Sequence, residues 1–217
     1  MEQKHVQSLG FGNKAQKTLL TTLIGASSFL TAPSAFGLID TQILTGKRWY
    51  NFEVDDQPSK NVNATSIDLA VHVDPIPLIP VAIGVGISSI SPSADDLGGS
   101  ATSMLQMGLD VQAWIPLIPV ITPYVRFRYP FMGELKITDS SEGEGKTKEG
   151  TYKLTGPAFD AGVKFSVLPF VKLLVQVGQS MDSIEISDYR INGVKQANPG
   201  SGQAHGTTAL VGLEVGI

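Results

Sequence analysis

Few side chains in this sequence have types and spacing that could support catalysis or metal binding. The chain has no Cys, and only two of its three His residues, His72 and His205, lie beyond residue 37. A catalytic base needs a partner within hydrogen-bond reach, and a metal site needs several converging ligands. We therefore interpret His72 as a hydrogen-bonding residue and His205 as an interfacial polar residue, and we expect no catalytic site, no metal and no cofactor.

Charged residues of both signs recur inside otherwise apolar segments, always at alternate positions. Opposite charges that meet in a partly dry interior form charge-assisted hydrogen bonds. We therefore predict a network of paired charges inside the fold. Its candidate members are Arg48, Asp68, Asp110, Arg126, Arg128, Asp160, Lys164 and Glu214.

The elements that must position these charges have a period of two. In "SIDLAVHV", for example, Ile67, Leu69, Val71 and Val73 alternate with polar or small residues, as in a strand with one apolar face. The same alternation predicts eight strands, in residues 39–52, 66–73, 81–88, 105–113, 124–129, 159–167, 173–178 and 209–217.

The connections between these strands are of two kinds, which alternate along the chain. Three are short, apolar and contain Pro, and the hexapeptide "IPLIPV" occurs in two of them, at 76–81 and 115–120. The other four are longer and rich in Gly, Ser and acidic residues. Short turns at one end and long polar loops at the other are typical of barrels in outer membranes. We therefore predict an all-β fold, an eight-stranded antiparallel up-and-down transmembrane β-barrel.

The first 37 residues have a different character. Lys4, Lys14 and Lys17 precede the uncharged run "TLLTTLIGASSFLTA", and Ala35-Phe36-Gly37 fits a signal peptidase site. We expect residues 1–37 to be a cleaved signal peptide and 38–217 to be a single barrel domain. Removing three Lys and one Glu leaves 13 basic and 19 acidic residues, a net charge of −6. Nucleic acid is therefore not an expected partner.

The last predicted strand resembles the terminal strand signature of outer-membrane barrels, with Ala209, Val211, Leu213, Val215 and Ile217 at alternate positions. Together with the alternating loops, residues 38–217 resemble the small eight-stranded outer-membrane class that includes the OmpA membrane domain, OmpX and OmpW. The resemblance implies a bacterial outer-membrane location, with membrane lipids, lipopolysaccharide and the barrel assembly machinery as partners. It implies no functional residue and leaves the oligomeric state open.

Several functions are compatible with such a barrel. Eight strands leave an interior that side chains can fill, so we expect a non-enzymatic barrel with a plugged lumen and an envelope or surface-contact role. A narrow pore for small solutes is the alternative, because many inward positions are Gly. A lipid-modifying enzyme is a less expected alternative. It would use His205 as its base, but no Ser lies two residues further on. A secreted lipocalin is another alternative, suggested by "GKRW" at 46–49.

Two finer expectations concern charges. The acidic pairs Asp55-Asp56 and Asp95-Asp96 could bind Ca²⁺, although solvated loop charge is the simpler interpretation. Centring the second Pro-containing turn near Ile118 places Asp110 opposite Arg126 and Gly108 opposite Arg128.

Overall fold

The computed structural model describes residues 39–216, except 55–58, 76–78, 94–95, 97–99, 102–103, 116–119, 141–146, 169 and 198–199. The predicted signal peptide lies outside the described residues. So do Asp55, Asp56, Asp95 and Ile217. No helix in the described part of the chain is long and apolar enough to cross a membrane.

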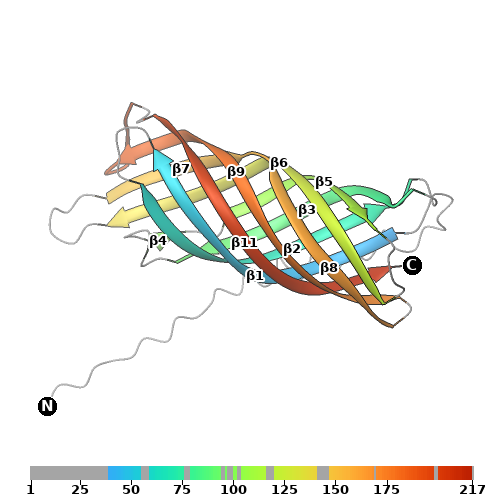
Figure 1. The fold of residues 1–217 in the computed structure, drawn as a ribbon. Helices are drawn as coiled ribbons and strands as arrows, with labels where there is room; N and C mark the ends of the chain where they lie inside the picture. The colour runs from blue at the N-terminus through green and yellow to red at the C-terminus, as the bar shows by residue number, and fades with distance from the viewer. Residues whose placement is uncertain are drawn as a thin grey trace, which may run out of the picture. The chain divides into compact units, whose positions relative to one another are not determined.

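The described residues form almost entirely strands, which Figure 1 labels in chain order. Their bounds are β1 (Ile39–Val54), β2 (Lys60–Val73), β3 (Val81–Pro92), β4 (Ser100–Ala101), β5 (Met104–Trp114), β6 (Ile121–Ser140), β7 (Thr147–Thr155), β8 (Ala158–Leu168), β9 (Val171–Ile191), β10 (Val194–Lys195) and β11 (Ser201–Gly216).

The strands close into a ring in which every pairing is antiparallel. The order is β1, β2, β3, β5, β6, then β7 and β8 end to end, then β9 and β11, and β11 pairs with β1. The two-residue strands β4 and β10 extend the ladders of β6 and β9. This is the predicted eight-stranded antiparallel barrel, visible as a closed cylinder of tilted strands in Figure 1.

The hydrogen-bond register fixes the stagger of the barrel. Paired residues can be followed from strand to strand around the whole ring. The path that starts at Ser91 on β3 comes back to β3 at Val81, ten residues earlier in the sequence. It passes through Thr65, Lys47, Ala209, Val177, Ala161, Val125 and Ala113. A stagger of this size on eight strands tilts them by about 40° from the barrel axis.

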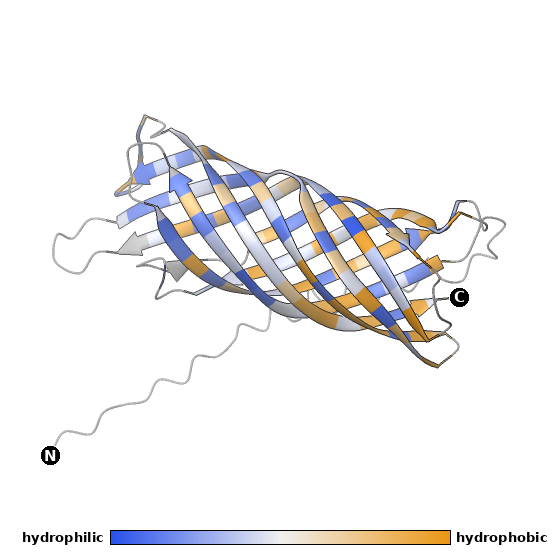
Figure 2. Ribbon diagram, viewed as in Figure 1, coloured by the Kyte–Doolittle hydropathy of each residue, from blue (hydrophilic) through white to orange (hydrophobic). Residues whose placement is uncertain are grey.

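The two faces of the strands divide as the sequence predicted. Inward positions such as Asp68, Asp110 and Glu214 are buried, whereas outward positions such as Val85, Leu109 and Val177 are each more than half exposed. Figure 2 shows that the apolar residues gather toward the end of the barrel with the short turns and the C-terminus, and hydrophilic residues toward the other end. An outward apolar surface of this kind suits contact with lipid.

Two predictions about the strands are wrong. Parts of the segments assigned to polar loops, such as 60–64, 147–150 and 187–191, belong to β2, β7 and β9. In addition, Asp110 pairs with Arg128 and Gly108 with Pro130, because Trp114 pairs with Tyr124 and the turn is centred one residue later than predicted. Moving the centre by one residue shifts the register by two, so each residue keeps its predicted face.

Candidate functional site

An ion-pair cluster around Glu214 lies in the lumen near the short turns. Lys172 donates to Glu214 Oε1 over 2.6 Å, and Lys164 donates to Glu214 Oε2. Gln42 also donates to Glu214 Oε2, over 2.6 Å, and to Gln112 Oε1 over 2.9 Å. The cluster joins β1, β5, β8, β9 and β11, so it crosses the lumen.

The middle of the lumen holds a second cluster around Asp110 on β5. Arg126 on β6 donates its Nε to both carboxylate oxygens, over 2.9 and 2.8 Å, and its Nη2 to Oδ2. His72 on β2 lies with Nε2 2.9 Å from Asp110 Oδ1. Asp110 and Arg126 meet as diagonal neighbours, since Arg126 pairs directly with Gln112.

A third cluster lies toward the loops and contains two carboxylates and two guanidinium groups. Arg48 on β1 donates to both oxygens of Asp68 on β2, over 2.9 and 2.7 Å. Arg128 on β6 bridges Asp68, 3.0 Å from its Nη1, and Asp160 on β8, 2.9 Å from its Nε. Thr208 on β11 also donates to Asp160. All eight side chains of the predicted network therefore lie in the lumen, divided among three clusters.

Beyond the third cluster, past the buried side chains of Gln106, Ser180 and Asp182, the lumen becomes apolar. Several strands extend past the outward apolar band. In this extension a set of buried side chains pack against one another inside the barrel. This apolar cluster consists of Tyr50, Val62, Ala64, Ile90, Met104, Leu135, Leu154, Ile184 and Ala204, with Phe52, Ile137 and Tyr152 packed against it.

The hydrophobic pattern of the wall therefore reverses along the barrel axis. Where the outer face is apolar, the lumen carries charge. Beyond that band the outer face carries exposed charges such as Glu134 and Lys136, which form an ion pair of 3.3 Å, and the lumen is apolar. The reversal has a simple cause, because a segment surrounded by water needs an apolar core, whereas a segment surrounded by lipid can bury its polar groups inside.

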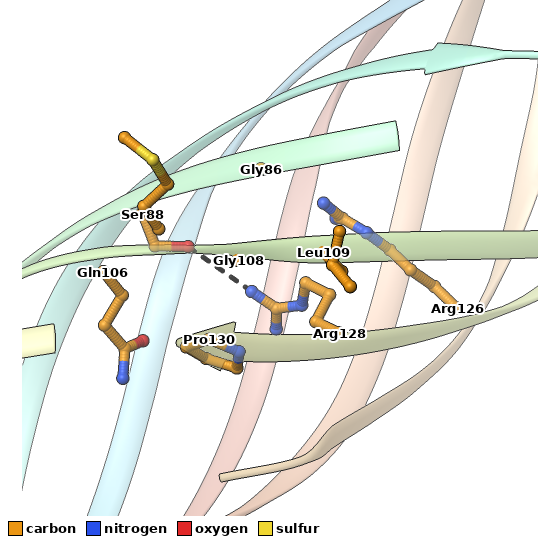
Figure 3. A pocket seen from close by; sticks show the side chains of 9 residues that line it. Gly86, Ser88, Gln106, Gly108, Leu109, Arg126, Arg128 and Pro130 are labelled. Atoms are coloured by element: carbon orange, nitrogen blue, oxygen red, sulfur yellow. Dashed lines mark hydrogen bonds between the residues drawn. The ribbon is translucent and has the colours of Figure 1, made fainter. Parts of the chain in front are cut away.

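A small void lies against the β5–β6 seam, shown in Figure 3. Gly86 on β3, Gly108 on β5 and Pro130 on β6 line it, together with Arg126 and Arg128. Its volume is about 20 Å³, room for one water molecule. Pro130 has no backbone N–H to donate to the ladder, and the register shifts between Met107 and Gly108, so the seam is irregular at this point.

Some buried polar atoms of the lumen have no hydrogen-bond partner among the described residues. They include Arg126 Nη1, Gln112 Nε2 and Gln176 Nε2. Such atoms are normally satisfied by water in a protein interior. The lumen thus has a few positions at which water would be stabilised.

The remaining candidate residues that the structure describes, His205 and Asp96, lie apart from each other on different strands or loops. His205 faces outward on β11, opposite Asn51 of β1 and Met181 of β9. Asp96 accepts hydrogen bonds from the backbone and side-chain nitrogens of Asn63, over 2.7 and 2.8 Å, so it ties its loop to β2. Within the described ranges, no group of three or more His, Cys, Asp or Glu side chains is placed to hold a metal ion.

The sequence interpretation missed two parts of the lumen. One is the set of amides and Lys172 that complete the cluster around Glu214. The other is the apolar cluster, whose signal lay in the alternation of "GELKI" at 133–137 and "SIEIS" at 183–187, within or beside segments that were assigned to polar loops.

No protein-family model and no curated protein sequence matches the chain. Among solved structures, it is similar to the outer membrane protein AlkL, determined in lipid bilayers, with a TM-score of 0.50 and 12% identity over 86% of this chain and 94% of that one. It is also similar to Neisserial surface protein A, with a TM-score of 0.46 and 14% identity over 82% of this chain and 98% of that one. Ail of Yersinia pestis gives 0.45 and 11% over 82% and 98%. At these identities the likeness concerns the fold alone, and the fold is that of the small eight-stranded outer-membrane β-barrels.

Proposed function

We propose that this protein is a non-enzymatic barrel of the bacterial outer membrane whose lumen is closed by its own side chains. Its role is in envelope structure or in surface contact through the loops and the strand extensions outside the membrane. The short Pro-containing turns face the periplasm in this proposal.

The observation that carries the proposal is the two-part filling of the lumen. Three clusters of paired charges lie in the part that lipid surrounds in this proposal, and an apolar cluster lies in the part beyond it. Each carboxylate of the charge network contacts a cationic side chain, and such pairs resist separation when buried. The void that reaches Arg126 and Arg128 has room for only about one water.

The strand extensions support a role in surface contact. β6, β7 and β9 continue past the apolar band as a three-stranded sheet whose register runs from Glu134 to Ser140 and from Ser183 to Ile191. A tight turn at Asn192 and Gly193, both with positive φ, ends β9. A rigid sheet of this kind can hold the adjoining loops in a fixed arrangement.

The available imidazoles favour a non-enzymatic role. His72 is fully buried and contacts Asp110. The two residues that pair directly with His205, Asn51 and Met181, are neither nucleophiles nor carboxylates.

Planar-bilayer conductance of the refolded protein tests the proposal. We expect the wild type to give no stable conductance steps, and Arg126→Ala combined with Arg128→Ala to give them, because both substitutions remove charges that bridge the lumen. Stable steps from the wild type would contradict a closed lumen.

A narrow pore is the second candidate, favoured by the buried polar atoms that lack protein partners. Gln112 Nε2, Arg126 Nη1 and Gln176 Nε2 could line a thin file of water. Small, reproducible conductance in the wild type, abolished by Gly86→Leu at the void, would favour this candidate.

A further inference from the structure

The outer wall of the barrel has a groove that the proposed function does not use. It has a volume of about 720 Å³ and crosses β5, β6, β8, β9 and β11. Most of the residues that line it face outward, among them Ala113, Val125, Ala161 and Val177, which belong to one hydrogen-bonded row. Its floor therefore lies on the lipid-facing surface.

The floor of the groove is low because two of these four residues are Ala. On the next outward positions toward the loops, Phe127 and Phe159 stand beside each other with ring centroids 5.0 Å apart. Both aromatic residues line the groove. The groove is thus an apolar depression with short side chains on its floor and two aromatic rings beside it.

One end of the groove reaches the polar boundary of the apolar band. Gln179 on β9 and Thr207 on β11 line this end, and they pair with each other in the ladder. Lys47 on β1 is exposed and faces the same side, since it pairs with Ala209, two residues from Thr207. The polar side chains of Gln179 and Thr207 and the cation of Lys47 therefore lie at the end of the groove where the outward surface changes from apolar to polar.

We propose that this groove binds one lipid A molecule of the outer leaflet, with an acyl chain along the alanine floor and a phosphorylated sugar at Gln179, Thr207 and Lys47. Because lipid tails are as apolar as the barrel wall, only close packing and polar contacts distinguish a bound lipid from bulk lipid. The alanine floor permits close packing of an acyl chain, and the polar end of the groove supplies the polar contacts. The proposal rests on the proposed outer-membrane orientation, in which this end of the groove opens toward the glycolipid leaflet.

Native mass spectrometry of the refolded protein in detergent tests the site. The probes are lipid A, phosphatidylglycerol and phosphatidylethanolamine, added at equal concentration. We expect one lipid A to remain bound to the wild type, in preference to either phospholipid. We expect Ala161→Phe to lower the bound fraction by roughly tenfold or more, because a ring in the groove excludes the chain.

Val85→Phe is the matched control, because Val85 faces outward on β3 and is not one of the residues that line the groove. It should retain lipid A, and Lys47→Gln should weaken retention of lipid A. Equal retention of either phospholipid, retention of lipid A by Ala161→Phe, or its loss in Val85→Phe would overturn the site. None of these results depends on conductance, so a failure here is separable from a failure of the closed-lumen proposal.

Discussion

The ion pair between Arg126 and Asp110 permits a direct test of the charge network. Asp110 is fully buried and accepts hydrogen bonds from Arg126 Nε and Nη2. Arg126→Met keeps most of the side-chain volume and removes the charge. The Asp110 carboxylate would then keep its contact with His72 but lose both donors of Arg126.

Removing one partner of a buried pair leaves an uncompensated charge, which costs about 3 kcal/mol of the free energy of unfolding. The matched control is Arg190→Met. Arg190 donates its Nε to Asp188 over 2.9 Å, the same distance as one of the Arg126 Nε contacts with Asp110, but its side chain is 48% exposed. An exposed pair of this kind contributes only about 0–1 kcal/mol.

Urea unfolding in lipid vesicles, followed by the fluorescence of the two Trp residues, measures both changes. We expect Arg126→Met to lower the free energy of unfolding by about 3 kcal/mol and Arg190→Met to lower it by no more than about 1 kcal/mol. Adding Asp110→Asn to Arg126→Met should restore part of the loss, since the buried charge is then gone. Equal effects at Arg126 and Arg190, or strictly additive effects at Arg126 and Asp110, would refute the pairing.

Three further predictions concern location, topology and the apolar cluster. The mature protein should fractionate with outer membranes and migrate differently on SDS gels before and after heating, because a closed barrel has no free strand edge; a soluble product without the shift would contradict the assignment. A tag between Asn192 and Gly193 should be accessible on intact cells and one at Leu117 should not, and the reverse labelling would invert the topology. Leu154→Ala should lower the free energy of unfolding by about 2–5 kcal/mol, because Leu154 is fully buried in the apolar cluster. Leu109→Ala, at a half-exposed outward position, should cost much less, and equal losses in the same urea assay would argue against a packed extramembrane core.

Much of the fold could be predicted from the sequence because the relevant signals are local. The period of two assigned Asp110, Arg126 and Asp160 to one face of their strands and Leu109, Val125 and Phe159 to the other. That assignment survives any register shift by an even number of residues. The period of two also predicted the number of strands, and the alternation of short Pro-containing and long polar connections predicted the up-and-down order.

The register and the partners of each charge were decided only by the tertiary structure. The Pro residues of "IPLIPV" mark a turn but do not fix its centre, and the ladder closes at Trp114 and Tyr124. Arg126 therefore reaches Asp110 diagonally. Arg128 bridges Asp68 and Asp160, from strands on opposite sides of β6 in the ring order, because the closed and staggered ring brings these strands around one lumen.

The reversal of hydrophobicity along the axis also depends on the tertiary structure. Leu135, Leu154 and Ile184 lie in or beside segments that are polar overall, and each alone resembles an isolated apolar residue near a loop. They become a core only when eight strands of unequal length extend past the membrane together and close around them. The alternation of side chains along a strand is determined by neighbouring residues in the sequence, whereas the point at which the surroundings change from lipid to water is determined by how far the assembled barrel extends.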